Sequence, residues 1–309
     1  MINLVTGGAG LIGSHLIDKL LSRDEKVICI DNFHTSSNLN LERFEKESNF
    51  KFLEHNIIDP INLNVDRIWH LASPASPFKY QKDPILTSKI IIFGSINVLE
   101  IARKNKAQIL LASTSEIYGD PKKNPQKEDY FGYVNPIGKR SCYVEGKRFS
   151  ESLFFDYLRT YNLDIKIARI FNTYGPGMLR DDGRVISNFI NQGLINEKLT
   201  LFGSGKQKRC FCYVEDMVDG IIKLMDSTYK GVINLGNPNE EFEIYELGKL
   251  IISKINKKLE MIKLMQREDE PQIRKPDISL AKDLLKWSPK IDINQGLDKT
   301  IDYFIQFVK

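Results

Sequence analysis

The chain has 309 residues, and 44 Lys and Arg against 40 Asp and Glu give it a formal net charge of +4. Hydrophobic residues make up 42% and charged residues 27%, a composition typical of a soluble globular protein with a substantial core. The basic residues are spread over many segments rather than gathered in one stripe, which argues against nucleic acid as a partner.

Short patterns bear on two further classes of protein. No basic segment followed by an apolar run precedes Met1–Thr6, and the apolar run Ile90–Phe93 is too short to cross a bilayer. The four cysteines and four histidines show no zinc-ligand spacing and no C-x-x-C pair, so we expect reduced cysteines and no metal. We therefore expect a soluble intracellular protein, located in the cytoplasm, with no membrane as a partner.

Short apolar runs alternate with helical patterns from the first residues onward. The runs predict buried strands at Ile2–Thr6, Lys26–Asp31, Lys51–Leu53, Arg67–Ala72, Ile109–Ser113 and Ile165–Ile170. Apolar residues at helical spacing predict helices over Leu11–Leu21, Ile85–Arg103 and Tyr143–Tyr161. This alternation predicts an α/β fold: a Rossmann-like, doubly wound parallel sheet that holds its ligands at the carboxyl ends of the strands.

The first strand runs into Gly7–Gly13 (GGAGLIG), which opens the first helix. A glycine-rich turn lets the backbone approach a pyrophosphate, and the helix N-terminus offers free N–H groups and a favourable dipole. Asp31 ends the second strand, where an acid can accept a hydrogen bond from a ribose 2′-hydroxyl. The same carboxylate would repel a 2′-phosphate, so NAD is favoured over NADP. The alternative is a tight glycine turn beside an ordinary solvated Asp.

Tyr143 and Lys147 stand four apart at the start of a helix, so their side chains are neighbours. A lysine ammonium near a phenol stabilises the phenolate, whose pKa of about 10 is otherwise too high for a base at neutral pH. The run Ser113–Glu116 at the end of the fifth strand should place hydroxyls, Ser115 among them, beside this phenol. A hydroxyl, a phenol, a lysine and a nicotinamide suffice to oxidise a secondary alcohol. Taken alone, Tyr-x-x-x-Lys is more often a surface pair.

After Asn172 the pattern changes, because glycines and prolines cluster in Tyr174–Gly177 and Gly203–Gly205 and helices mix with short strands such as Leu199–Phe202. We interpret residues 1–171 as the sheet domain, with parts of 210–236 returning to it. Residues 172–309 are predicted to form mainly a smaller C-terminal α/β domain over the carboxyl edge of the sheet.

The order and spacing of these motifs resemble the extended short-chain dehydrogenase/reductases. Longer segments resemble the UDP-glucuronate decarboxylases, also called UDP-xylose synthases: Asp31–Phe33, His70–Phe78 (HLASPASPF), Ser113–Pro121 (STSEIYGDP), Asn135–Lys147, Ala168–Pro176 (ARIFNTYGP), Asp182–Phe189 (DGRVISNF) and Arg274–Asp277. The similarity runs from Met1 to about Phe304. It implies that the sheet domain binds NAD and that the smaller domain binds a UDP-sugar.

The resemblance also implies site residues. Those for NAD are Gly7, Gly10, Leu11, Ile12, Asp31, Asn32, Thr35, Asn56, Ile57, Leu71, Ser73, Ala112, Tyr143, Lys147, Thr173 and Arg184. Those for the UDP-sugar are Lys89, Asn97, Asn172, Arg209 and Arg274, and the catalytic set is Tyr143, Lys147, Ser115, Glu116 and Arg274. The chain departs from the family pattern at Ser36, Ile91 and Val144, and we expect none of these three to touch the catalytic residues.

The implied reaction converts UDP-glucuronate to UDP-xylose and CO2 through C4 oxidation, loss of CO2 from the 4-keto acid, C5 protonation and C4 re-reduction. Related dehydratases carry an acid where this chain has Ser115, and a serine cannot protonate a departing hydroxyl well. Glu116 would manage protons or an ordered water, and Arg274 would orient the carboxylate or act near C5. Three alternatives stay open: a decarboxylase that releases the 4-keto pentose and NADH, a 4-epimerase, and a binding module for NAD or a sugar nucleotide.

The two long helices carry more apolar side chains than one buried face requires, among them Phe93, Phe149, Phe154 and Phe155. An exposed apolar patch implies a partner surface, and related enzymes pair these helices into a four-helix bundle. We therefore predict a homodimer. The alternative is that both helices simply pack on the sheet.

Overall fold

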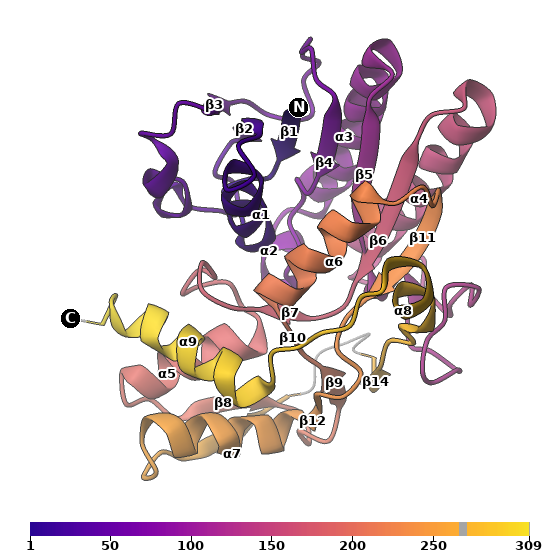
Figure 1. The fold of residues 1–309 in the computed structure, drawn as a ribbon. Helices are drawn as coiled ribbons and strands as arrows, with labels where there is room; N and C mark the ends of the chain where they lie inside the picture. Colours follow the sequence, from indigo (N-terminus) through magenta and orange to yellow (C-terminus); the bar gives the residue numbers. More distant parts are fainter. Residues whose placement is uncertain (266–270, 309) are drawn as a thin grey trace.

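The structure is a computed structural model that describes residues 1–265 and 271–308. The larger of its two parts is built on a seven-stranded sheet (Figure 1). The strands lie in the order β11-β6-β5-β4-β1-β2-β3, and neighbouring strands are parallel. Their bounds are β1 Ile2–Thr6, β2 Lys26–Asp31, β3 Phe50–Glu54, β4 Arg67–His70, β5 Gln108–Thr114, β6 Ile165–Ile170 and β11 Gly231–Leu235. The predicted Rossmann-like fold is confirmed. The strand order reverses between β1 and β4, which leaves a crevice for a ligand at their carboxyl ends.

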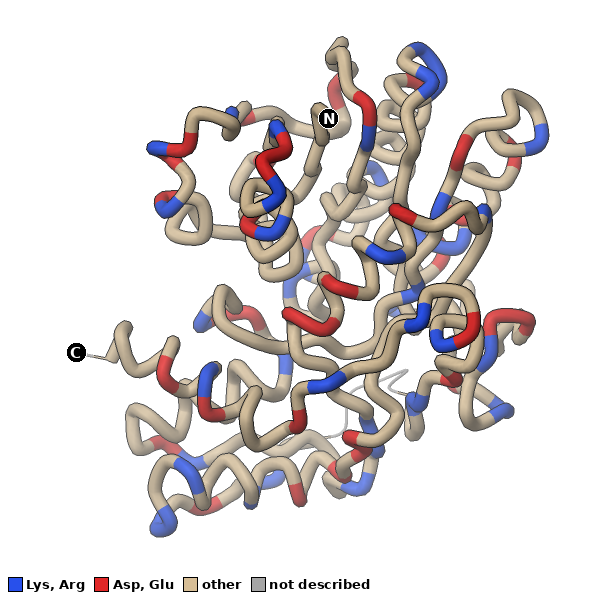
Figure 2. The backbone as a smooth tube through the Cα atoms, in the orientation of Figure 1, with Lys and Arg blue, Asp and Glu red and all other residues tan. Residues whose placement is uncertain are grey.

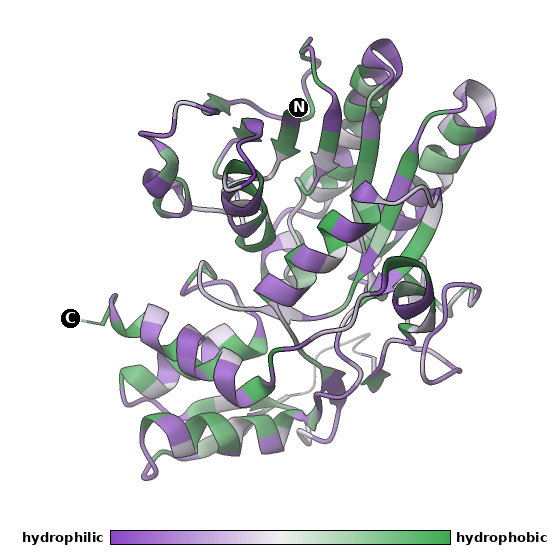
Figure 3. Ribbon diagram, viewed as in Figure 1, coloured by the Kyte–Doolittle hydropathy of each residue, from purple (hydrophilic) through white to green (hydrophobic). Residues whose placement is uncertain are grey.

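Helices cover both faces of the sheet (Figure 1): α1 (Leu11–Leu21) and α6 (Val214–Asp226) on one face, α3 (Pro84–Asn105) and α4 (Ser141–Tyr161) on the other. Successive strand residues point to opposite faces, so Val5 joins the core under α1 and α6, and Leu4 joins the core under α3 and α4. Figure 3 shows the strands mostly green and the outer turns of the helices purple. This two-sided burial explains why continuous apolar runs predict the strands.

The smaller domain covers the carboxyl edge of the sheet. Its larger elements are α5 (Val185–Leu194), α7 (Ile244–Ile255), α9 (Ile293–Ile305) and the paired strands β8 (Leu199–Phe202) and β13 (Met261–Leu264). Three short strands form a further sheet, in the order β12 (Glu241–Glu243), β9 (Lys208–Cys210) and β14 (Ile273–Arg274). Two-residue strands β7 (Thr173–Tyr174) and β10 (Cys212–Tyr213) pair where the chain crosses between the two domains.

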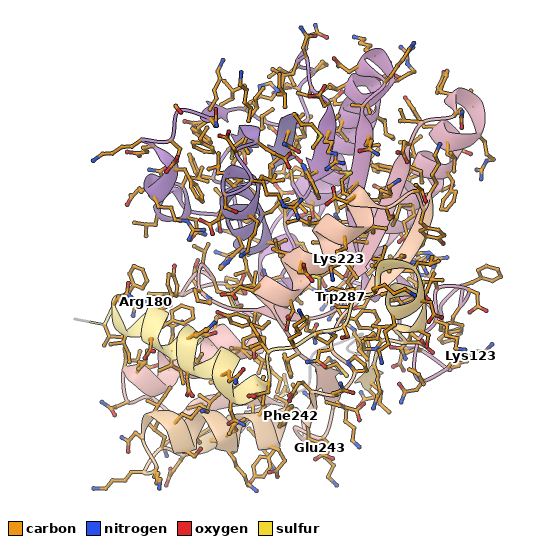
Figure 4. The ribbon with its side chains drawn as sticks, viewed as in Figure 1. Lys123, Arg180, Lys223, Phe242, Glu243 and Trp287 are labelled. Atoms are coloured by element: carbon orange, nitrogen blue, oxygen red, sulfur yellow. The ribbon has the colours of Figure 1, made fainter. Side chains whose placement is uncertain are left out.

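The chain returns to the main sheet twice. In the first return, α6 covers one face and β11 adds an edge strand beside β6. The second return, α8 (Ser279–Leu285) with Trp287, lies outside what the sequence pattern predicts. Trp287, labelled in Figure 4, packs so closely on α6 that a Cβ at Gly220 would lie 2.9 Å from its ring. Its indole N–H donates to the backbone carbonyl of Asp216 at 3.0 Å.

Helix α3 corrects one expectation from the sequence. It contains an 18-residue window with a mean hydropathy of 1.7, so it is long and apolar enough to cross a membrane by length and composition. The uninterrupted apolar run Ile90–Phe93 is only a small part of this longer window, so the run alone does not reveal it. Half of the window is buried inside the fold, and the core helix of a soluble protein passes the same test, so the feature is weak evidence for a membrane span. Charged residues of both signs are interleaved over the surface seen in Figure 2.

Candidate active site

A cavity of about 340 Å³ lies at the carboxyl edge of the sheet, where the smaller domain meets the ends of the strands. Its wall contains residues from the segments 7–13, 31–36, 71–77, 112–116, 170–174 and 182–189. Every residue predicted to bind NAD borders this cavity, and so do Ser115, Glu116, Asn172, Arg209 and Arg274. The fold therefore brings residues of both domains to one site.

Two predicted substrate residues lie elsewhere. Lys89 is exposed on α3 and is not part of the cavity wall. The side-chain amide of Asn97 donates to the backbone carbonyls of Ile57 and Ile58, at 2.9 and 2.8 Å. Asn97 thus holds a loop whose residue Ile57 borders the cavity. The amide nitrogen of its side chain donates both of its hydrogen bonds to that loop. The sequence shows that Lys89 and Asn97 lie on one helix, but packing decides whether each side chain points toward the cavity or away from it.

Close backbone contacts enforce the glycine turn. Gly7 has a φ of +73°, and a Cβ there would lie 2.7 Å from the backbone nitrogen of Ala72. A Cβ at Gly13 would lie 2.4 Å from the carbonyl oxygen of Gly7. Gly10 is the N-cap of α1, and no side chain caps this helix end or places an acid in its first turn. The first N–H groups of a helix lack intrahelical partners, so this end suits a phosphate.

Asp31 lies between the glycine turn and the following loop. One carboxylate oxygen accepts a hydrogen bond from the Ala9 N–H at 3.0 Å, and the other accepts from the Phe33 N–H and the Ser36 hydroxyl, at 2.9 and 2.8 Å. A carboxylate has about four acceptor positions, so Asp31 can accept a further bond from a ribose. Ser36, one of the departures from the family pattern, thus fixes the acid rather than disturbing it.

Tyr143 is buried on the first turn of α4, and its side chain hydrogen-bonds to that of Thr114. The hydroxyl beside the phenol is therefore that of Thr114, whereas the sequence prediction named Ser115. Alternation along β5 does not reveal it: Ser113 points to the same face as Ile109 and Leu111, and its hydroxyl donates to Glu151 of α4, the helix that also carries Tyr143. Thr114 belongs with the candidate catalytic residues.

The charge of Lys147 acts differently from the expectation. Its ammonium donates to the carbonyl oxygen of Ala112 at 2.8 Å and lies 5.9 Å from the centre of the Tyr143 ring. Burial lowers the pKa of Lys147 to about 8, although the charge of Glu151 opposes this. Burial and the charge of Glu116 raise the pKa of Tyr143 above its usual value. In the chain by itself, Tyr143 is therefore a neutral phenol.

Glu116 lies deep in the wall, between two arginines. Arg140 contacts one carboxylate oxygen at 2.7 Å, Arg274 contacts the other at 3.4 Å, and the Tyr80 hydroxyl donates to the first at 3.2 Å. Burial alone would raise the pKa of Glu116, but the charges of Arg140 and Arg274 lower it to about 2. The carboxylate is therefore ionised at neutral pH. It pairs with the two arginines as their counter-charge, and its predicted role in handling protons or an ordered water stays a prediction.

Arg274 is the incompletely paired member of this group. Its side chain is 7% exposed and its Nη1 makes the long contact to Glu116. Among the residues that the structure describes, its buried Nε has no hydrogen-bond partner. An unsatisfied buried donor costs free energy, so a ligand acceptor at this position would be favoured. Arg209 is fixed beside it: β9 and β14 pair in register at these two residues, and the Arg209 guanidinium donates to the carbonyls of Pro271 and Gln272.

Comparison with known proteins identifies the family. Residues 4–300 match the sequence model of the GDP-mannose 4,6 dehydratase family, which lies within the extended short-chain dehydrogenase/reductases. UDP-glucuronic acid decarboxylase 3 of Arabidopsis thaliana is 50% identical over 295 residues, which cover 95% of this chain and 86% of that protein. UDP-glucuronic acid decarboxylase 1 of Xenopus tropicalis is 48% identical, over 97% of this chain and 71% of that protein. The chain belongs to the UDP-glucuronic acid decarboxylase family.

Solved structures of two 4-epimerases share the fold of nearly the whole chain. UDP-glucuronic acid 4-epimerase from Bacillus cereus, in complex with UDP-glucuronic acid and NAD, is 30% identical with a TM-score of 0.91, covering 99% of this chain and 100% of that one. UDP-glucose 4-epimerase from Thermotoga maritima, with UDP-glucose, is 28% identical with a TM-score of 0.91 over 100% of both chains. The resemblance found from the motifs is confirmed.

Three residues in or beside the candidate site were missed from the sequence: Thr114, Arg140 and Tyr80. Arg140 is the N-cap of α4, and its carbonyl accepts the N–H groups of Tyr143 and Val144. Its backbone starts the helix of the candidate base, while its side chain holds Glu116. A further expectation is wrong, because Ile91 and Val144 do touch the catalytic set: both pack in one apolar cluster with Tyr80 and Tyr143.

Proposed function

We propose that the chain converts UDP-glucuronate to UDP-xylose and CO2, with NAD bound throughout and returned unchanged after each turnover. The curated relatives at 48–50% identity support the reaction. The observation that carries the proposal is the buried guanidinium of Arg274, which borders the cavity and whose Nε has no partner among residues 1–265 and 271–308. A carboxylate on the substrate can accept from such a guanidinium through parallel hydrogen bonds.

The residues present suit NAD. Gly7 and Gly13 leave no room for a side chain at the turn, the uncapped end of α1 faces the cavity, and Asp31 keeps acceptor capacity. NAD would be held by the glycine turn, Asp31 and Lys147. When bound, it supplies the acceptor for a hydride from C4 of the sugar and returns that hydride at the end of the turnover.

In this proposal Tyr143 moves the proton of the C4 hydroxyl. Its phenol must become a phenolate before it can accept that proton, and positive charge brought near it would favour this change. The hydrogen bond with Thr114 and the charges of Arg184 and Arg274 already offset part of the rise that burial causes in the pKa of Tyr143. The same oxygen gives the proton back when C4 is reduced. Thr114 fixes the direction of the hydroxyl group.

Oxidation at C4 makes a β-keto acid. The bond between C5 and the carboxylate carbon then breaks, CO2 leaves, and its electron pair passes into the C4 ketone as an enolate. One proton added at C5 completes the balance before C4 is reduced. In this proposal Arg274 orients the leaving carboxylate, and Glu116 holds Arg140 and Arg274 in place. Ser115 supplies no acid for loss of a hydroxyl, so dehydration does not compete.

The deciding experiment is one incubation of the purified chain with UDP-glucuronate and NAD, with the products resolved by NMR and NADH followed by absorbance. UDP-xylose and CO2 without net NADH are expected. A 4-keto pentose with one NADH per CO2 would replace the proposal with the oxidative decarboxylase. A 4-epimer without CO2 would replace it with an epimerase.

We also propose that the chain is a homodimer built on α3 and α4, working in the cytoplasm. Phe93 and Phe149 are each 46% exposed on these packed helices, whereas Phe154 is fully buried in the sheet core. The four cysteines are unpaired, which suits a reducing compartment. Sedimentation should give the mass of two chains. The double variant Phe93→Ser with Phe149→Ser should sediment as a monomer, and a parent that is already a monomer would refute the dimer.

A further inference from the structure

Tyr80 is a fully buried residue behind the cavity wall. It is the last residue of α2 (Pro77–Tyr80), its side chain is 0% exposed, and it does not border the cavity. A buried phenol needs a partner for its hydroxyl. Tyr80 satisfies this need at the reaction site itself, by donating to Glu116 at 3.2 Å.

The ring of Tyr80 makes a second contact with the site. It stacks on the ring of Tyr143 with 4.9 Å between centroids and an interplanar angle of 3°. The guanidinium of Arg140, which contacts the same oxygen of Glu116, lies 5.9 Å from the Tyr80 ring centre. One side chain therefore touches both the group that moves the C4 proton and the group that holds the arginines.

The backbone of Tyr80 is fixed from two helices. Its carbonyl accepts a hydrogen bond from the Thr87 hydroxyl of α3 at 3.1 Å and lies 3.7 Å from the Cys142 thiol of α4. Ile91 and Val144 complete the apolar packing around the stacked rings. With its carbonyl and both ends of its side chain fixed, Tyr80 can transmit a displacement from one contact to the other.

We propose that Tyr80 is a positioning residue that couples the oxidation end of the site to its decarboxylation end. Its ring sets the plane of Tyr143, and its hydroxyl sets the carboxylate of Glu116 and, through it, Arg274. This inference rests on the proposed decarboxylation. Its two contacts belong to different atoms of one side chain, so they can be removed separately.

The test compares Tyr80→Phe, which keeps the ring and removes the hydroxyl, with Tyr80→Leu, which removes both. Each full-length variant is mixed with NAD and UDP-glucuronate, and NADH absorbance and CO2 are followed through a single turnover. The matched control is Tyr157→Phe, which removes a hydroxyl that donates to Glu100 at 2.7 Å, outside the cavity wall. Titration with UDP and a far-UV circular dichroism spectrum report binding and folding.

Tyr80→Phe should oxidise C4 within about twofold of the parent rate and release CO2 about tenfold more slowly, because a hydrogen bond to a charged group is lost. NADH should then accumulate more than in the parent. Tyr80→Leu should lower both rates about tenfold, without that accumulation. The control should match the parent.

Three results would overturn the coupling: Tyr80→Phe matching the parent in both steps, equal slowing of both steps in Tyr80→Phe, or Tyr80→Leu oxidising C4 at the parent rate. If Tyr80→Leu does not fold, the split between the two steps in Tyr80→Phe still decides. A parent that oxidises the sugar without releasing CO2 refutes the proposed function instead. In that case C4 oxidation alone tests the contact between the rings of Tyr80 and Tyr143: Tyr80→Phe should keep the parent rate of oxidation, and Tyr80→Leu should lower it.

Discussion

Two buried arginine–glutamate groups lie near the carboxyl ends of β5 and β6, and they differ in how completely they are paired. Arg169 donates through Nε and Nη2 to Glu151 and through Nη1 to the Tyr118 hydroxyl and the Glu128 carbonyl. Neither Arg169 nor Glu151 borders the cavity. Arg274 borders it, and within the described part of the chain it has one long contact to Glu116 and a buried Nε without a partner.

Completeness of hydrogen bonding therefore separates a structural ion pair from a functional one. A fully satisfied buried pair has nothing left to offer a ligand, and losing one member strands the other in a low-dielectric interior. An incompletely paired guanidinium at a cavity wall already lacks part of its stabilisation, and a substrate carboxylate can supply it. The four predictions that follow test this difference, from the largest expected effect to the smallest.

Tyr143→Phe should lower the rate of C4 oxidation by about 10²–10⁴-fold, since general base catalysis is worth that much. It removes only one oxygen next to Thr114 and leaves both arginine groups intact, so the free energy of unfolding should change little. Single-turnover NADH formation and a denaturation curve measure the two effects. A near-normal oxidation rate would show that another group takes the proton.

Matched substitutions of the two arginines should give opposite results. Arg274→Ala should lower CO2 release by about 100-fold, spare NAD and UDP binding, and lower stability less than Arg169→Ala does, because Arg140 still pairs with Glu116. Arg169→Ala should lower the free energy of unfolding by about 3–5 kcal/mol, because Glu151 stays buried without its partner, while the folded fraction remains active. CO2 assays and urea denaturation of both variants check this.

Two outcomes would break the contrast. Equal loss of stability in both variants would show that Arg274 is also a structural residue. Decarboxylation by Arg274→Ala at the parent rate would remove it from the reaction. Arg274→Lys should recover little activity, because a point charge cannot reproduce the planar fork of a guanidinium. A lysine variant as active as the parent would show that charge alone is enough.

Glu116→Gln should combine both kinds of loss, slowing CO2 release and destabilising the fold. The pKa of Glu116 is lowered from 4.5 to about 2, so its ionised form stabilises the fold above pH 4.5 and loses this effect as the pH falls through about 2. We expect the free energy of unfolding of the variant to be about 3 kcal/mol lower than that of the parent at neutral pH. Denaturation curves at several pH values should show the gap narrowing in acid. A gap independent of pH would mean that Glu116 is not the counter-charge of the two arginines.

Asp31 should give the smallest of these effects, because it sets the preference for NAD over NADP and takes no part in the reaction steps. NAD should bind at least about tenfold more tightly than NADP, because the partly buried carboxylate of Asp31 repels the 2′-phosphate of NADP at a distance of a few ångströms. Asp31→Asn should narrow the preference while leaving Tyr143 and both arginine groups untouched. Calorimetric titration of the two dinucleotides measures it. Equal affinities in the parent would remove Asp31 from its assigned role.

The sequence by itself determined the sheet, the glycine turn, Asp31 and the Tyr143–Lys147 pair. Each of these is local: a strand buried on both faces needs a continuous apolar run, a turn with a φ of +73° at Gly7 needs glycine, and a helix places residues four apart side by side. Such rules act within a few residues, so they can be read along the chain.

Only the tertiary structure decided which polar side chains meet. Arg140, Glu116 and Arg274 come from a helix start, the turn after β5 and β14, and no local rule brings them together. Packing also turned Asn97 toward the loop at Ile57 and Ile58, and placed Thr114 rather than Ser115 beside Tyr143. The pKa of a buried group depends on what surrounds it in three dimensions. The charges near Glu116 and Tyr143 were therefore fixed by the fold and not by the spacing of residues in the chain.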